Sequence, residues 1–434
     1  MQNLLKAIIV LHYKMSSSDT SVSSDVIGEE EQTDYEGKVL GDYNIIKKIG
    51  HGSYSTVWLT YNTSDSKFYA LKVQNPEDYS DGIEEIKVLN KLEKHKNILN
   101  LKEYFIKRRN DEKILCSAFD LHFGNLDGII RKGNFKNGFP LDNVKQIFRQ
   151  IVEGVNIIHN RCKLTHCDIK TDNILVKGVG ESVIPIISEY RNLNFHEKYK
   201  ILKNDYWVNK LQKNINNIKK MKKKDRYKLK KSLHKEFISN IKLNLGEDKF
   251  YEKSNNYEED IDDIEITIGD FGAACTEDEF YESEFGTRYY MSPEVILGGK
   301  INEKVDVWAL GCILYELING EFLFDPDKDK YKSRNYYHLL EMSKVSGKFD
   351  KKYLKSTKNW RNYFDSDGYL KDTEFKEYYD IDELLFKVTN IKERSLVKDL
   401  LLKTLILNPV NRISARDILD HEFLKNSELS ENVS

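Results

Sequence analysis

A short polar loop followed directly by an apolar strand, residues 165–176 with the sequence THCDIKTDNILV, constrains this chain more than any other stretch. Its Asp168 is placed to receive a proton from a hydroxyl group. Lys170 can reach a phosphate oxygen, and Asn173 offers an amide oxygen to a metal ion. One loop thus presents a base, a cation and a metal ligand. An ordinary solvated turn can contain the same residue types, so the loop needs support from elsewhere in the chain.

A glycine-rich turn lies upstream between two predicted strands. Alternation of residue types predicts strands at 43–49 and 56–61, joined by residues 50–55 (GHGSYS). Small residues there let backbone N–H groups close over phosphates. The third glycine of the usual GxGxxG pattern is replaced by Ser55, so the turn alone is weak evidence.

Two motifs downstream complete an ordered set. Asp270-Phe271-Gly272 follows a predicted strand at 266–268, and Ser292-Pro293-Glu294 ends a 25-residue segment that starts at Asp270. Together with the turn, a lysine in the strand 68–73 and the polar loop, they stand in the order typical of eukaryotic-type serine/threonine protein kinases. Residues 40–425, without an insertion at 177–262, resemble this family. The resemblance implies an α+β, bilobal fold. Its N-lobe is small and mostly antiparallel β with one main helix, and its C-lobe is larger and α-helical.

The resemblance implies ATP and Mg²⁺ as cofactors and gives residues their roles. Asp168 accepts the proton, Lys170 offsets charge on the moving phosphoryl group, and Asn173 and Asp270 hold magnesium. Lys72, alone an ordinary edge-strand lysine, orients the phosphates and needs a carboxylate to fix it. Glu84 and Glu85 open a predicted helix, and the position in EEIKVL favours Glu85. Further nucleotide contacts are expected from Ile49, Gly50, His51, Gly52, Ser53, Tyr54, Ser55, Val57, Ala70, Phe119 and Leu121.

Other residues receive structural roles from the same resemblance. His166 is expected to brace the metal-binding loop, Asp306 to brace the backbone of the catalytic loop, and Glu294 to pair with Arg412. Further strands are expected at 98–106 and 113–121. Apolar residues at helical spacing predict a long amphipathic helix over 141–160.

The expected domain boundaries leave a large insertion. The expected segments are a disordered N-terminal tail (1–39), the N-lobe (40–122), the C-lobe in two parts (123–176 and 263–425), a basic spacer between these two parts (177–262) and a C-terminal tail (426–434). Residues 198–235 contain fifteen Lys and Arg against two Asp. Such a block is a solvated tether or, alternatively, a nuclear-localisation or nucleic-acid patch. The apolar stretch 4–13 is too short to span a bilayer and lacks a cleavage site, which favours a tail or a start at Met15.

The closer resemblance is to the SR-protein kinases. It depends on the segments 41–43, 50–59, 139–141, 168–170, 272–275, 316–317, 320–326 and 347–349, and on a spacer at the same point of the kinase domain. This implies substrates rich in serine and arginine, linked to mRNA processing. Two departures weaken that implication: the sequence KDKYKSR at 328–334 replaces part of the acidic docking surface, and Met291 disfavours proline-directed specificity. A serine/threonine kinase of unrelated specificity remains the alternative.

Composition and single positions add further expectations. Five cysteines without a CxxC pair indicate a reducing compartment, hence the cytoplasm with nuclear shuttling as an option. A net charge of −2 points to neither nucleic acid nor membrane, and we expect a monomer. Lys170 and Thr287 follow the serine/threonine arrangement. Cys167 replaces an arginine that in many kinases grips a phosphate, which predicts activity without activation-segment phosphorylation, and we expect its thiol to be inert. A pseudokinase scaffold is disfavoured because Lys72, Asp168 and Asp270 are all present.

Overall fold

The computed structural model describes residues 35, 38–52, 54–62, 64–65, 67–109, 112–132, 134–178, 183–184, 186–187, 264–276, 285–371 and 378–425. They belong to two compact units, one of Met1–Gly50, Trp58–Tyr69 and Val179–Asn255, the other of His51–Val57, Ala70–Gly178 and Asn256–Ser434. The C-terminal tail, most of the N-terminal tail and nearly all of the basic spacer lie outside the described residues. Within those residues, no helix has the length and hydropathy needed to cross a bilayer.

The first unit contains a short strand, most of a second strand and parts of two more. β1 (Val39–Leu40) pairs with β2 (Tyr43–His51), and β3 (Ser55–Asn62) and β4 (Lys67–Gln74) continue the order. The side chains of β2 alternate in burial, and the Tyr43 ring meets the ring of Tyr69 edge to face at 6.0 Å. Thr60 Oγ1 donates to Tyr69 O at 3.1 Å. The strands predicted at 43–49 and 56–61 are confirmed.

In the second unit, the part of β4 after Tyr69 joins two further strands. β6 (Glu112–Phe119) pairs antiparallel with β4 on one side and with β5 (Glu103–Arg109) on the other. The strand expected at 98–106 is therefore wrong in its first half. Ile98 pairs instead with Ile268 in an isolated parallel bridge, and Leu99 N donates to Ile268 O at 2.9 Å. Ile98 and Leu99, the apolar residues that suggested a strand here, form hydrogen bonds or a bridge with Ile268 and not with β6.

The main helix of this part, α2 (Tyr79–Lys91), begins five residues before the expected start at Glu84. A short 3-10 turn, η1 (Pro76–Asp78), leads into it. Glycine has a low helix propensity, so Gly82 made the first turn look unfavourable. A Cβ atom at Gly82 would lie 2.8 Å from Leu115 Cδ2, which shows that the helix needs glycine to approach β6 closely.

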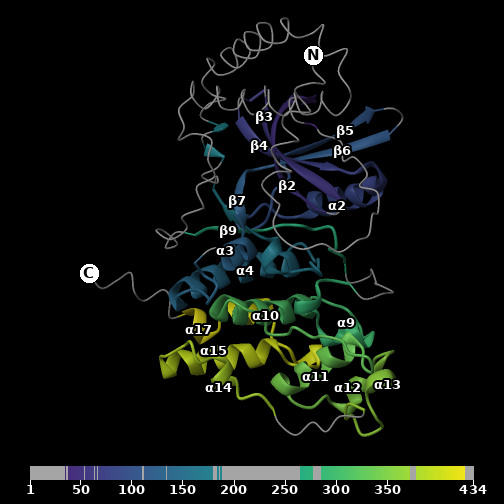
Figure 1. The fold of residues 1–434 in the computed structure, drawn as a ribbon, viewed down its shortest axis with the longest axis vertical. Coiled ribbons are helices and arrows are strands. Elements are labelled where there is room, and N and C mark those ends of the chain that lie inside the picture. The colour runs from purple at the N-terminus through teal and green to yellow at the C-terminus, as the bar shows by residue number, and fades with distance from the viewer. Residues whose placement is uncertain are drawn as a thin grey trace, which may run out of the picture. The chain divides into compact units, whose positions relative to one another are not determined.

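The rest of the second unit is mainly helical (Figure 1). Its elements are β7 (His122–Asn125), α3 (Leu126–Lys132), α4 (Leu141–Asn160), η2 (Thr171–Asn173), β8 (Ile174–Lys177), β9 (Ile266–Ile268), η4 (Arg288–Tyr290), α9 (Pro293–Leu297), α10 (Lys304–Asn319), α11 (Arg334–Ser346), α12 (Lys351–Lys355), α13 (Trp360–Tyr363), α14 (Ile381–Leu384), α15 (Ile391–Thr404), η5 (Pro409–Asn411), α16 (Ala415–Leu419) and α17 (Glu422–Lys425). The fold class predicted from the sequence, an antiparallel β lobe and a helical lobe, is correct.

Helix α10 is the centre of the helical core. Fifteen of its residues, Val305 to Asn319, are buried, and Figure 1 shows it between α4 and α15. A helix that is apolar on all sides must be covered on all sides. Helix α4, by contrast, buries one face through its apolar stripe, and it has the bounds predicted from that stripe, Leu141 to Asn160.

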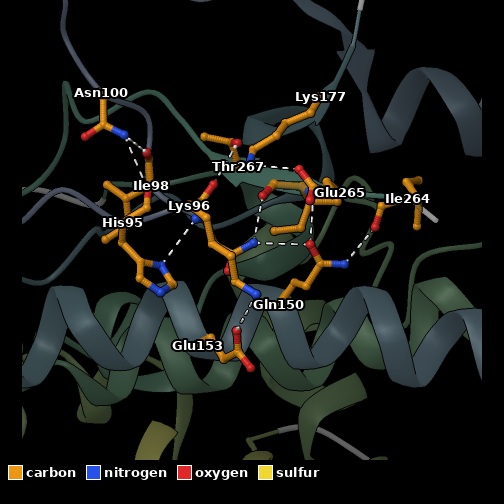
Figure 2. Close-up of polar contacts among 12 residues, drawn as sticks. His95, Lys96, Ile98, Asn100, Gln150, Glu153, Lys177, Ile264, Glu265 and Thr267 are labelled. Atoms are coloured by element: carbon orange, nitrogen blue, oxygen red, sulfur yellow. Dashed lines mark hydrogen bonds and ion pairs between the residues drawn. The ribbon is translucent and has the colours of Figure 1, made fainter. Parts of the chain in front are cut away.

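Gln150 on α4 ties down the strand where the chain returns after the insertion (Figure 2). Its Oε1 accepts hydrogen bonds from Ile266 N at 3.1 Å and from Asn97 Nδ2 at 3.2 Å, and its Nε2 donates to Ile264 O at 2.8 Å. Asn97 Nδ2 also donates to Ile266 O at 2.9 Å. Strand β9 then pairs antiparallel with β8, with Leu175 opposite Thr267. The two strands that flank the insertion are thus adjacent.

Candidate active site

The backbone of the catalytic loop forms hydrogen bonds with one buried carboxylate, that of Asp306. Asp306 Oδ2 accepts a hydrogen bond from His166 N at 2.8 Å and Oδ1 accepts one from Cys167 N at 2.9 Å. The ring nitrogen Nε2 of His159 lies 2.8 Å from Asp306 Oδ2. The side chain of Asp306 is 1% exposed. The expected bracing by Asp306 is confirmed, and it stabilises a loop in which Cys167 has a φ of 68°, a region that non-glycine residues seldom adopt.

Asp168 lies at the centre of the hydrogen bonds of this loop. Its Oδ1 accepts from Thr287 N at 2.9 Å and from Thr287 Oγ1 at 2.8 Å, and its Oδ2 lies 2.7 Å from Lys170 Nζ. Burial raises the pKa of Asp168, but the hydrogen bond and charge of Lys170 outweigh it, so that this pKa lies below its ordinary value. The carboxylate is therefore ionised at neutral pH, as a proton acceptor must be.

Lys170 connects the base to the segment opposite. Its Nζ donates to Thr287 Oγ1 at 2.8 Å in addition to its ion pair with Asp168. Thr287, used above only as a marker of serine/threonine kinases, is thus part of the site. A threonine hydroxyl can bond to both neighbours at once, because it donates one proton and accepts others.

The two residues expected to hold magnesium lie in connected segments. Asn173 Nδ2 donates to Asp168 O at 2.8 Å, which leaves the amide oxygen to face a metal ion. Asn173 O accepts from Gly269 N at 2.8 Å, next to Asp270. His166 Nε2 lies 3.0 Å from Gly269 O, so the expected brace from His166 to the metal-binding loop is present.

These ligands suit magnesium. Mg²⁺ prefers oxygen ligands and takes one or two from the protein, with the remainder from phosphates and water. A carboxylate at Asp270 and an amide oxygen at Asn173 match that pattern. In the part of the chain that the structure describes, no group of three or more His, Cys, Asp and Glu gathers as a self-sufficient metal cage.

The strand lysine is paired as predicted. Lys72 Nζ lies 2.6 Å from Glu85 Oε2, and both side chains are largely buried, at 23% and 11% exposure. Glu84 instead pairs with Lys87 on the exposed side of α2. The choice of Glu85 as the fixing carboxylate is therefore confirmed, while the role of Lys72 toward phosphates stays a prediction.

The residues expected to contact the nucleotide are distributed over four strands and their connections. Ile49, Gly50 and His51 end β2, Gly52 and Tyr54 lie in the turn, Ser55 and Val57 lie in β3, Ala70 lies in β4, Phe119 ends β6, and Leu121 precedes β7. Ser53 lies outside the described residues. Gly52 N donates to Ser55 O at 2.9 Å, which closes the turn, and Ala70 lies directly opposite Phe119. Their contacts with a nucleotide remain predictions.

A buried polar cluster under the catalytic loop has no counterpart in the sequence predictions. Glu316 accepts a hydrogen bond from Tyr290 Oη at 2.6 Å and forms an ion pair with Arg131. Tyr290 Oη also lies 3.0 Å from Thr171 Oγ1, just after Lys170. Burial raises the pKa of Glu316 to about 7, although the Tyr290 hydroxyl and Arg131 oppose that shift. No spacing pattern could have brought these residues together, because they are scattered over nearly 190 positions.

The expected ion pair between Glu294 and Arg412 is present and wholly buried. Arg412 donates to the two carboxylate oxygens of Glu294 at 2.7 and 3.0 Å, and both side chains are 0% exposed. Arg412 also donates to Lys304 O at 2.6 Å. This pair ties α9, at the end of the activation segment, to α10 and to the chain after α15.

A carboxylate oriented by a lysine and a threonine hydroxyl, two side chains with oxygen atoms that suit magnesium, and a paired strand lysine are the features of a phosphotransferase with the fold of a protein kinase. Comparison with known proteins agrees: the model of the protein kinase domain matches residues 43–187 and 253–424. The chain belongs to the protein kinase family. It is a protein serine/threonine kinase, as the arrangement of Lys170 and Thr287 also indicates.

Three relatives are similar to this chain along most of their own length. A protein named as a serine/threonine-protein kinase in Acanthamoeba polyphaga mimivirus is 26% identical, over 94% of this chain and 92% of its own. The serine/threonine-protein kinase SRPK of Physarum polycephalum is 27% identical, over 88% of this chain and 86% of its own. Protein kinase dsk1 of Schizosaccharomyces pombe is 26% identical, over 86% of this chain and 78% of its own. The expected resemblance to the SR-protein kinases is confirmed.

Proposed function

We propose that this kinase transfers the γ-phosphoryl group of ATP to serine residues in arginine-rich protein segments. The observation that carries the chemistry is the position of Asp168, whose carboxylate is oriented by Thr287 and Lys170. In this position it accepts the proton of the substrate hydroxyl, while Lys170 offsets charge on the transferred group. Magnesium, held by Asp270 and Asn173, would supply neutralisation of phosphate charge.

The similarity to an SR-protein kinase of Physarum polycephalum supports the choice of substrate. A group of carboxylates after α10 supports it too. Asp325 and Asp327 are exposed, and Glu341 on α11 lies close enough to feel their charges. Burial, together with Asp325 and Asp327, raises the pKa of Glu341 to about 7. A guanidinium group placed among these three residues would relieve their mutual repulsion, which favours an arginine-rich partner.

The third acidic residue of this segment has a different task. Asp329 Oδ1 accepts hydrogen bonds from Tyr331 N and Lys332 N, each at 2.7 Å, and its other oxygen accepts one from Tyr337 Oη. Asp329 therefore fixes the conformation of residues 328–334, the loop that contains Lys328, Lys330, Lys332 and Arg334. We assign docking to Asp325 and Asp327, with Glu341 adding negative charge next to them, and exclude Asp329 from it.

Kinetics on matched peptides test this proposal. An arginine–serine repeat should have a higher kcat/KM than a lysine–serine repeat of equal charge, because guanidinium groups can bond to carboxylates with two hydrogen bonds. The double variant Asp325→Asn, Asp327→Asn should raise KM for the arginine peptide only. Asp420→Asn, which changes an exposed carboxylate after α16, is the control. Equal kcat/KM for both peptides would sink the arginine preference and favour a serine/threonine kinase of unrelated specificity.

The cellular location follows as a further part of the proposal. The five cysteines are all free thiols in the structure, as a reducing compartment would keep them. We propose cytoplasmic residence, with entry into the nucleus as a property of the spacer. Microscopy of the tagged full chain, with and without residues 198–235, tests both statements.

A further inference from the structure

Two thiols are in contact beside the catalytic loop. The Sγ atoms of Cys167 and Cys275 lie 3.4 Å apart, and both side chains are buried. Cys167 directly precedes Asp168, while Cys275 lies five residues after Asp270. One sulfur contact thus joins the loop of the base to the segment that follows the expected metal ligand.

Backbone hydrogen bonds fix the chain at both sulfurs. Thr165 N donates to Cys275 O at 2.8 Å, and Cys275 N donates to Thr165 O at 2.9 Å, which forms an antiparallel bridge. Cys167 N is bound to Asp306 at the same time. Because the backbone is held on both sides, the fold itself keeps the thiols together.

Although the sequence alone suggested an inert thiol at Cys167, we propose from this contact that Cys167 and Cys275 are a redox pair, which hydrogen peroxide converts to a disulfide that lowers the turnover of the kinase. One thiol attacks the peroxide and becomes a sulfenic acid, with release of water. The second thiol displaces a second water from that sulfenic acid. Two S–H bonds and the O–O bond break, one S–S bond and two waters form, and the two electrons lost by sulfur reduce the peroxide oxygens. A thiol such as glutathione reverses the step by exchange.

A hollow beside the base gives peroxide a route to Cys167, one of the two thiols. Its lining includes Cys167, Asp168, Gly286 and Thr287. The hydrogen bond with Cys275, together with burial, raises the pKa of the Cys167 thiol well above its ordinary range, so Cys167 keeps its proton. The reaction with peroxide should therefore be faster at higher pH, where a larger fraction of the thiol is ionised.

Closing the disulfide must displace the neighbouring base. An S–S bond measures about 2.05 Å, so sulfurs now 3.4 Å apart must approach by about 1.3 Å. With a φ of 68°, Cys167 has little conformational freedom to absorb the shift alone. The adjacent Asp168 depends on hydrogen bonds of 2.8 and 2.9 Å from Thr287, which a shift of this size breaks. A misplacement of about 1 Å can reduce a rate on the order of a hundredfold.

The test uses the full-length wild-type protein, treated with hydrogen peroxide, desalted and assayed with Mg-ATP and a generic basic peptide. Peptide mapping without reductant should show Cys167 linked to Cys275. The kcat should fall on the order of a hundredfold. The KM for ATP should not change, because Lys72 and Glu85 are outside the displaced loop. Dithiothreitol should break the disulfide and restore kcat. The rate of linking should rise with pH, since the attacking species is a thiolate.

Two variants complete the experiment. Cys275→Ser removes one sulfur and should keep its kcat through peroxide treatment. Cys162→Ser, which changes a partly buried thiol outside the pair, should respond like the wild type. A map without the link, under conditions that oxidise Cys162, would overturn the pairing, and linked protein with unchanged kcat would overturn its effect. The peptide map does not depend on substrate preference, so this result is independent of the arginine proposal.

Discussion

Arg412 and Glu294 join the end of the activation segment to the helical core through a bidentate ion pair, with both side chains fully buried. Removing one partner leaves the other charge buried and unpaired, which costs roughly 3–5 kcal/mol. Arg412→Leu should lower the free energy of unfolding by about that amount, measured by urea denaturation. The control is Arg161→Leu, whose pair with Glu93 is solvent-exposed and contributes about 1 kcal/mol or less. Equal losses of unfolding free energy in the two variants would show that the buried ion pair contributes no more than the exposed one.

The two neighbouring glutamates of α2 should differ sharply in their effect on catalysis. Glu85→Ala frees Lys72 from its 2.6 Å ion pair and should reduce kcat/KM on the order of a hundredfold, as loss of one oriented charge does. Glu84→Ala removes only an exposed pair with Lys87 and should behave as the wild type. Steady-state kinetics with ATP varied give the comparison. A similar loss in both variants would mean that helix stability, and not the orientation of Lys72, is responsible.

Replacing the base or the strand lysine should abolish turnover while the fold persists. Asp168→Asn and Lys72→Met should each reduce kcat by about two to four orders of magnitude. Far-UV circular dichroism should remain unchanged, because neither side chain belongs to the apolar core. Residual activity within about tenfold of the wild type in the Asp168→Asn variant would place the base elsewhere.

Activity should not require phosphorylation of the activation segment. Cys167 offers no cation to a phosphate, and Thr287 already holds Asp168 through two hydrogen bonds. Protein treated with a phosphatase, and shown by mass spectrometry to be free of phosphate, should keep its kcat. Loss of activity that returns after incubation with ATP would refute this prediction.

The buried Glu316 should make stability depend on pH. Its pKa is raised to about 7 in the folded protein, from an ordinary value of 4.5, so the folded state binds more protons in this interval. Its contribution is fully present below about pH 4.5 and is lost as pH rises through about 7. Over this interval, Glu316→Gln should gain stability relative to the wild type, by roughly 3 kcal/mol at most. Urea denaturation across the interval measures it, and a pH-independent difference would contradict the shift.

Two glycines with nearly the same φ should respond differently to alanine. Gly138 and Gly347 have φ values of 91° and 90°, but only at Gly138 would a Cβ atom collide with backbone, 1.9 Å from Ile318 O. Gly347→Ala should cost about 1–2 kcal/mol from strain alone. Gly138→Ala should cost more by about 1–3 kcal/mol, because the loop and the end of α10 must separate. Thermal unfolding of both variants checks the order.

Sequence patterns correctly predicted those parts of the fold that depend on local periodicity or on motif order. The apolar stripe of α4 gave its bounds, and the position of Glu85 in its helix gave the partner of Lys72. The start of α2 was wrong because Gly82, unfavourable in a helix, is required by the close approach of Leu115. The first half of the strand expected at 98–106 was wrong because an apolar run does not say which sheet it joins.

Contacts between distant residues without a motif could not be predicted. Cys167 and Cys275 are 108 positions apart, and Glu316 meets Arg131 across 185 positions. Neither pair has a spacing that local geometry dictates, so only the folded chain reveals the dithiol and the buried polar cluster. Thr287 is an intermediate case: its place in the motif was visible, but its two bonds to Asp168 were not.

The pairing of β8 with β9 has a consequence for the length of chain that can connect these two strands. Lys177 N donates to Glu265 O at 2.9 Å, so the chain leaves and re-enters the fold at neighbouring points. For a flexible connection, doubling the length costs only about 0.6 kcal/mol. Asn173 and Asp270 therefore stay in register whatever length joins the two strands. The same junction offers a natural place for new termini in a circular permutant, or for splitting the enzyme into two complementing fragments.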